Sequence, residues 1–207
     1  MRAEQVDRLL VGVNGSVITE GDLYIARRLN DIVYPGRPAT PVSREEEIDR
    51  RINLELIRQE LKNLRLEIED ESLVRTKLEA VTERYSGSGG LARILEASGI
   101  SNEELYEFLE HEVLTARFLD FRFRPFVRVE RKEIEDYYRE RLQPQLRESG
   151  VDIPPLEEVS KKIEEILMEE KISRELDLWV ENARDNARIE YFLDDTLRSP
   201  EKGSERR

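Results

Sequence analysis

Two long segments of this sequence carry apolar side chains on more than one face of the helix that their periodicity predicts. In the segment from Ser101 to about Phe123, two roughly opposite arcs are both apolar. The first arc holds Leu105, Phe108, Leu109, Val113, Ala116, Leu119 and Phe123, and the second holds Leu114, Phe118 and Phe121. Such a helix is either buried between two neighbours or keeps its second stripe as a surface for a partner.

The last long segment, from Pro155 to about Asn186, changes its apolar face halfway along. Its two stripes are rotated by roughly 160° from one another. They comprise Leu156, Val159, Ile163, Ile166 and Leu167 in the first half, and Ile172, Leu176, Trp179 and Ala183 in the second. Because no Pro or Gly supplies a kink, we expect the halves to pack against different partners. The first half then pairs with the segment carrying Ile134, Tyr137 and Leu142, as a protruding helical hairpin over about 130–167.

Local stop and start signals divide the rest of the chain into helices. Gly and Pro are scarce, at 10 and 8 residues, and they cluster between periodic apolar segments. Capping boxes are formed by Thr19 with Asp22, Ser43 with Glu46, and Ser101 with Glu104. The helix from Ser43 is expected to reach Ile68, and Asp70 is expected to cap the next. A loop is expected around Pro144 and over 150–155.

The two ends of the chain are expected to meet in one small sheet. Asn14-Gly15 lies between short apolar runs and predicts a hairpin, because both turn positions need a positive φ. A lone hairpin is marginal in water, and residues 188–193 can supply a third strand. The predicted fold class is therefore mostly α, a multi-helix module with a small β-hairpin plus a C-terminal strand. We expect one domain over 1–193, with its core in 6–124 and about 168–193, and a disordered tail over 194–207.

The composition removes most catalytic chemistry. The chain has no Cys and one His, His111, so it lacks the residues for a thiolate nucleophile or a His-rich metal site. No glycine-rich phosphate loop follows a strand. The net charge of −12 disfavours nucleic acid and anionic membranes as partners. We expect no enzyme, no cofactor, no metal and no membrane insertion. No signal peptide precedes the fold, which on sequence alone indicates a cytoplasmic protein or a removed leader.

A basic and aromatic patch stands out in this acidic chain. It comprises Arg117, Phe118, Phe121, Arg122, Phe123, Arg124, Phe126, Arg128, Arg131 and Lys132. Three interpretations are open. The aromatic side chains can pack in a core while the cations pair with nearby acids, or the patch can bind polypeptide, or it can bind single-stranded nucleic acid.

The order of these motifs resembles the SurA family of periplasmic folding factors. The similar segments are Val11–Leu23, Ile48–Arg58, Leu66–Val74, Gly99–Leu105, Arg124–Val129 with the following Tyr137-Tyr138, and Ala187–Phe192. The resemblance covers nearly the whole chain. It implies a chaperone that holds unfolded, aromatic-rich chains, typically outer-membrane proteins, in the periplasm.

One departure from that family bears on activity. Many members carry a parvulin isomerase domain where this chain has only about Leu142 to Pro155, far too short for a domain. We therefore expect chaperone function without prolyl isomerase activity. An isomerase that lost its catalytic domain is a further interpretation.

The predicted site is a peptide-binding surface without catalytic residues. Its candidates are Leu114, Phe118 and Phe121, with Tyr137 and Tyr138 as secondary members. The expected partners are unfolded polypeptide clients, with a homodimer as a further possibility. The alternative function is a non-catalytic scaffold or assembly protein that binds one folded partner.

Overall fold

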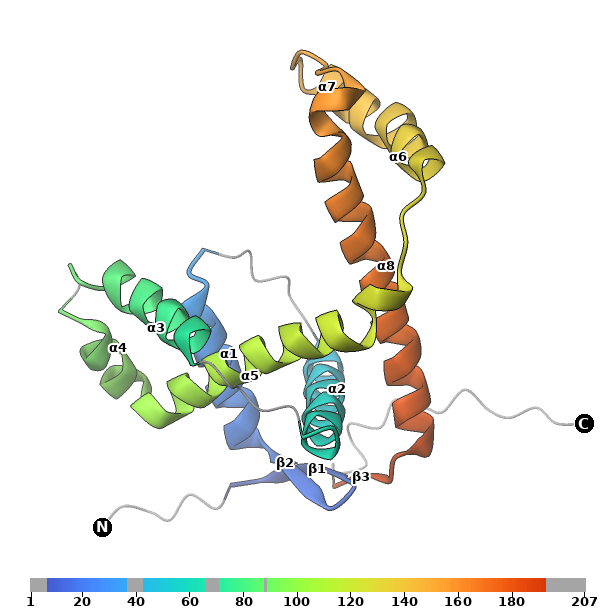
Figure 1. Cartoon of the computed structure of the whole chain (residues 1–207). Coiled ribbons are helices and arrows are strands. Elements are labelled where there is room, and N and C mark those ends of the chain that lie inside the picture. The colour runs from blue at the N-terminus through green and yellow to red at the C-terminus, as the bar shows by residue number, and fades with distance from the viewer. Residues whose placement is uncertain (1–6, 37–42, 66–70, 88, 193–207) are drawn as a thin grey trace, which may run out of the picture. The chain divides into compact units, whose positions relative to one another are not determined.

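Helices dominate the computed structural model, which describes residues 7–36, 43–65, 71–87 and 89–192 (Figure 1). A small three-stranded antiparallel sheet completes it. The predicted fold class, mostly α with a sheet that both chain ends build, is therefore confirmed. The chain divides into two compact units. Unit 1 comprises Met1–Thr115 and Asn182–Arg207, and unit 2 comprises Ala116–Glu181.

The sheet of unit 1 has the strand order β2-β1-β3. The strands are β1 (Leu9–Val13), β2 (Ser16–Thr19) and β3 (Ile189–Tyr191), and β1 pairs antiparallel with both others. The hairpin turn forms as predicted, with φ of 50° at Asn14 and 91° at Gly15. The third strand comes from the other end of the chain, so β1 is covered on both of its edges.

Two helices follow the hairpin, and both start as predicted. Helix α1 (Glu20–Val33) and helix α2 (Arg44–Asn63) each have a complete capping box at the N-terminus. Helix α2 ends at Asn63, earlier than expected, because Arg65 adopts a left-handed φ of 50° that no helix can continue. The predicted end at Ile68 lies outside the described residues. A core cluster joins these elements to the sheet: Leu10, Val11, Val13, Ile18, Leu23, Ile48, Ile52 and Leu56.

A second core cluster of unit 1 joins the next helices. These are α3 (Ser72–Arg84), α4 (Leu91–Ser98) and the first part of α5 (Asn102–Arg122). The cluster holds Leu29, Ile32, Val33, Val74, Val81, Leu91, Leu95, Ile100, Leu105, Leu109 and Val113. The predicted Ser101–Glu104 box forms, with the Glu104 amide donating to Ser101 Oγ at 3.1 Å. The predicted cap Asp70 lies outside the described residues.

Unit 2 is built from the end of α5 and the helices after it. These are the 3-10 helix η1 (Arg124–Phe126), α6 (Arg131–Tyr137), the π-helical turn η2 (Tyr138–Leu142), α7 (Gln143–Glu148) and most of α8 (Leu156–Asn186). Hydrogen bonds and ion pairs join α6 and η2 to α8 and the residues just before it. Lys171 pairs with Glu133, and Arg141 pairs with Glu170.

The expectation that Pro144 lies in a loop is wrong, because Pro144 lies in the first turn of α7. The π-helical turn explains how the helix accommodates it. The Gln143 amide donates to the Tyr138 carbonyl, five residues back, which shifts the hydrogen-bond register just before the proline. Pro has no amide hydrogen to donate. In the first turn of α7 a backbone amide has no partner within the helix, so the proline costs no hydrogen bond there.

The extent of the predicted domain parts stays a prediction. The boundaries of the two units fall inside α5 and inside α8. The expected core over 6–124 and about 168–193, and the expected hairpin over about 130–167, were placed by sequence pattern alone. The expected disordered tail over 194–207 lies outside the described residues.

Candidate polypeptide-binding surface

Phe118 belongs to the core of unit 2. Its side chain is completely buried. Its ring meets Phe123 edge-on at 5.6 Å between ring centroids and Trp179 at 5.3 Å. Buried edge-to-face contacts of this kind stabilise a fold beyond the area that they remove from water. The prediction that Phe118 contacts a client is therefore corrected: this side chain is enclosed by its own unit.

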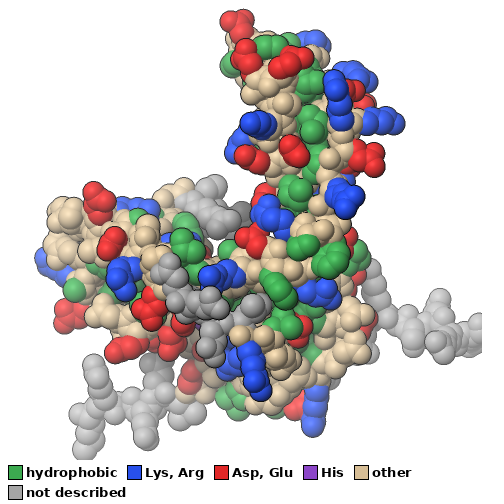
Figure 2. Space-filling view, in the orientation of Figure 1, with side chains coloured by type: hydrophobic (Ala, Val, Ile, Leu, Met, Phe, Trp, Pro, Cys, Tyr) green, Lys and Arg blue, Asp and Glu red, His purple; other side chains and the backbone are tan. Residues whose placement is uncertain are grey.

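Phe121 and Phe126 lie at the surface of the same unit. Phe121 lies three residues after Phe118 and only about 60° from it around the helix, yet the ring contacts of Phe118 are with Phe123 and Trp179. Its side chain is 61% exposed, and that of Phe126, in η1, is 79% exposed. Figure 2 shows hydrophobic side chains at the surface of unit 2 among the charged ones. Sequence reasoning included Phe126 in the basic patch but missed it as a site residue; its position after Pro125, beyond the helix end, was the available signal.

The remaining predicted site residues are placed differently. Leu114 is half-buried and belongs to unit 1. Tyr137 is half-buried, with the guanidinium carbon of Arg141 4.4 Å from its ring centroid. Tyr138 donates a hydrogen bond from its hydroxyl to the carbonyl of Pro154 at 2.7 Å. Both tyrosines therefore have intramolecular contacts, and of the five predicted residues only Phe121 presents most of its side chain to solvent.

Ion pairs fix the backbone around the two exposed phenylalanines. Arg124 pairs with Asp120 at 2.6 Å and with Glu169 at 2.9 Å, and these hydrogen bonds raise the pKa of Arg124. Lys171 Nζ donates to the Arg128 carbonyl at 2.6 Å and to Glu133 at 2.7 Å. The link between η1 and α6 is thus tied to α8 on one side.

Glu133 is the carboxylate at the start of α6 that receives the most hydrogen bonds. It accepts the Glu130 backbone amide at 2.8 Å in addition to Lys171. The Glu130 amide is the larger cause and Lys171 the smaller one, and together they lower the pKa of Glu133. The carboxylate therefore stays ionised at neutral pH and keeps its contact with Lys171.

The structure divides the basic and aromatic patch into a packed part and an exposed part. Phe118 and Phe123 pack in the core, and Arg124 and Arg131 pair with acids, Arg131 with Glu135 at 2.9 Å. The other members lie outside this packed part. Phe121 and Phe126 are exposed, and Arg122 lies 5.9 Å from the Phe123 ring centroid.

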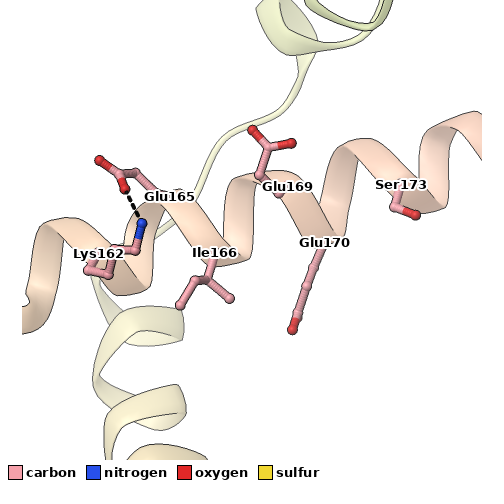
Figure 3. Close-up of a pocket in the computed structure, with 6 residues that line it drawn as sticks. All are labelled: Lys162, Glu165, Ile166, Glu169, Glu170 and Ser173. Atoms are coloured by element: carbon pink, nitrogen blue, oxygen red, sulfur yellow. Dashed lines mark hydrogen bonds and ion pairs between the residues drawn. The ribbon is translucent and has the colours of Figure 1, made fainter. Parts of the chain in front are cut away.

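A shallow pocket of about 640 Å³ lies on α8 (Figure 3). A single stretch of α8 lines it, through Lys162, Glu165, Ile166, Glu169, Glu170 and Ser173. Its charged side chains already have partners in unit 2: Lys162 pairs with Glu165, and the two adjacent glutamates pair with Arg124 and Arg141. The pocket is therefore a groove along one helix and has no convergent polar groups.

The described residues contain no group of three His, Cys, Asp or Glu side chains that can hold a metal ion. None of their helices is long and apolar enough to cross a membrane. His111 lies on the part of α5 in unit 1. Loss of hydration of the imidazole lowers the pKa of His111, and the positive charges of Arg58 and Arg51 lower it further. The imidazole is therefore neutral at pH 7.

No family model matches this chain, and no curated protein matches it either.

Proposed function

We propose that this protein is a chaperone that binds unfolded or extended polypeptides in the periplasm, without prolyl isomerase activity. The observation that supports the proposal is the exposure of Phe121 and Phe126, at 61% and 79%. Isolated apolar side chains are common on protein surfaces, but these two are the most exposed large apolar side chains of the described residues. The resemblance of the motifs to the SurA family supports the same class of function and the same compartment.

The buried aromatic cluster holds the backbone near these two residues in place. Phe118 packs between Phe123 and Trp179, so the end of α5 and the start of η1 are held in place. An exposed phenylalanine on a fixed backbone loses little conformational freedom when it binds, because its side chain has only two torsions. Aromatic and aliphatic side chains of a client are the complementary partners. Holding a client in this way needs contact area and no reactive group.

The test measures suppression of aggregation when a urea-unfolded outer-membrane protein is diluted into buffer. We expect the double variant Phe121→Ser/Phe126→Ser to lose suppression while its far-UV circular dichroism stays unchanged. The matched control is Val151→Ser/Leu178→Ser, which removes two other exposed apolar side chains of unit 2, 54% and 60% exposed. The control is expected to suppress aggregation as well as the unaltered protein does.

Two results would contradict the proposal. One is full suppression by the double variant, and the other is equal loss in the control. A pull-down from a cell envelope separates the proposal from the scaffold alternative, because a single stoichiometric folded partner favours the scaffold. Turnover of a proline-containing peptide would contradict the absence of isomerase activity.

A further inference from the structure

The segment Phe121–Lys132 has a charge opposite to that of the chain as a whole. It holds five cationic side chains and one carboxylate, a net charge of +4, in a chain with a net charge of −12. The cations are Arg122, Arg124, Arg128, Arg131 and Lys132. The whole segment, which includes the two exposed phenylalanines, lies in unit 2. A local excess of one sign attracts ligands of the other sign to that place.

Three of these cations have no acidic partner among the described residues. Arg124 pairs with Asp120 and Glu169, and Arg131 pairs with Glu135. Arg122, Arg128 and Lys132 are exposed and form no ion pair with any residue that the structure describes. The one carboxylic residue of the segment, Glu130, is the N-cap residue of α6, and its backbone carbonyl accepts the Glu133 amide at 3.0 Å. The three remaining cations are therefore available to an external anion.

The backbone between η1 and α6 also has unused hydrogen-bonding groups. Val127 and Glu130 have extended dihedral angles. Side-chain exposure alternates from Phe126 to Glu130, with Val127 and Val129 half-buried and the others exposed, as on a strand that packs on one face. Lys171 binds the Arg128 carbonyl. In the described part of the chain, no group bonds to the amides of Arg128 and Val129 or to the carbonyls of Val127 and Val129.

We propose that the segment Phe121–Lys132 selects extended polypeptide segments in which carboxylate side chains accompany aromatic ones. This inference rests on the proposed chaperone function and adds the charge of the preferred client. The exposed rings contact the aromatic side chains, and Arg122, Arg128 and Lys132 pair with the carboxylates. The free backbone groups pair with the client backbone in the manner of an added strand.

The same features favour a polypeptide over other anions. A lipid surface or a nucleic acid also carries negative charge, but neither offers alternating amide and carbonyl groups to the link at Val127–Val129. The acidic remainder of the chain also repels an extended anionic surface or polymer. A short acidic peptide segment contacts only the cationic part and avoids most of that repulsion.

The test uses three fluorescent peptides of one length and one aromatic content, whose spacer residues are Ser, Asp or Lys. Fluorescence anisotropy gives the affinity of each. At low salt we expect the Asp peptide to bind about tenfold more tightly than the Ser peptide, since three exposed ion pairs contribute a little each. The preference should vanish at about 1 M salt, where the screening length falls to about 3 Å.

The variant Arg122→Gln/Arg128→Gln/Lys132→Gln tests the assignment to this segment. We expect it to lose the preference for the Asp peptide and to bind the Ser peptide unchanged. The matched control, Arg147→Gln/Lys161→Gln/Arg174→Gln, removes three other exposed cations of unit 2 and the same total charge. It should keep most of the preference. Equal losses in both variants would overturn the inference, because bulk charge would then explain the effect.

The outcomes also separate this inference from the proposed function. Binding of the Ser peptide without any preference for the Asp peptide overturns the inference alone. Failure of every aromatic peptide to bind overturns the chaperone function. Phosphatidylglycerol vesicles and a single-stranded oligonucleotide complete the set, and tighter binding of either than of the Asp peptide would overturn the choice of a polypeptide partner.

Discussion

The two units bury their apolar side chains to different extents. Unit 1 has two core clusters, one between the sheet, α1 and α2, and one that joins α1, α3, α4 and α5. Unit 2 has a smaller set of buried side chains: Phe118, Phe123, Ile163, Leu167, Ile172 and Val180. It also has the three most exposed large apolar side chains of the described residues, Phe126, Phe121 and Leu178. Unit 2 thus combines a small core with the most exposed of the large apolar side chains.

The difference indicates what each unit depends on for stability. Several ion pairs connect α8 to the rest of unit 2, through Glu169, Glu170 and Lys171. Partly exposed ion pairs contribute little free energy each, whereas a buried aromatic side chain contributes several kcal/mol. The aromatic cluster around Phe118 is therefore expected to dominate the stability of unit 2, while unit 1 depends on many aliphatic contacts.

The largest effect is expected for Phe118→Ala in unit 2. Removing a fully buried phenylalanine leaves a cavity and costs about 4 kcal/mol of unfolding free energy. Trp179 is the only tryptophan of the chain and contacts Phe118, so its fluorescence during urea titration reports on this unit. The midpoint should fall strongly. In the control, Phe121→Ala, the exposed side chain should cost less than about 0.5 kcal/mol.

Leu109→Ala is the matching change in unit 1. Leu109 is completely buried in the cluster that joins α3, α4 and α5, and its truncation should cost about 3 kcal/mol. Amide hydrogen exchange in α3 and α4, read by mass spectrometry, measures the loss. Leu54→Ala, at a position of α2 that is 47% exposed, is the control. If Leu109→Ala shifts the Trp179 midpoint as far as Phe118→Ala does, the two units unfold as one, and the comparison between them fails.

Signals contained in a few neighbouring residues predicted much of unit 1. The Asn14-Gly15 turn and the boxes at Thr19, Ser43 and Ser101 all form as expected. Each depends on the backbone and side chains of three or four consecutive residues, so the local sequence is sufficient. The end of α2 was placed too late because a non-glycine residue, Arg65, takes the left-handed conformation.

The candidate site in unit 2 was harder to predict because it depends on tertiary contacts. Phe118 and Phe121 lie on one apolar arc of α5, and only the position of Trp179 determines that the first is buried. Periodicity gives the direction of a side chain and not the element that covers it. Pro144 was misplaced for a related reason, since a π-helical turn has no reliable sequence signature.

A smaller effect is expected for Glu55→Gln, which tests how much a charged group adds to unit 1. Glu55 on α2 accepts two hydrogen bonds of 2.6 Å from Arg58 and one of 2.8 Å from Gln59. Burial raises the pKa of Glu55, but the hydrogen bonds from Arg58, Ser16 and Gln59 outweigh it and lower the pKa below its ordinary value of 4.5. The variant should lose about 1.5 kcal/mol of stability at neutral pH.

The sign of the pH dependence follows from the lowered pKa. The unfolded chain binds a proton at Glu55 more readily than the folded chain does, so the carboxylate stabilises unit 1 above about pH 4.5. This contribution is lost as the pH falls through the folded-state value. Hydrogen exchange of α2 at a series of acidic pH values should show a shallower decline in the Gln variant. An unchanged decline would show that another group is responsible.

The smallest effect is expected for Glu170→Gln, which tests the minor role assigned to ion pairs in unit 2. Glu170 pairs with Arg141 at 2.8 Å, and the two side chains are 30% and 56% exposed. Such a pair contributes about 0.5 kcal/mol, and salt screening reduces that further. The Trp179 midpoint in urea should therefore move slightly at low salt and not at all at about 1 M salt. A loss as large as that of Phe118→Ala would show that unit 2 depends on its ion pairs and not on its aromatic cluster.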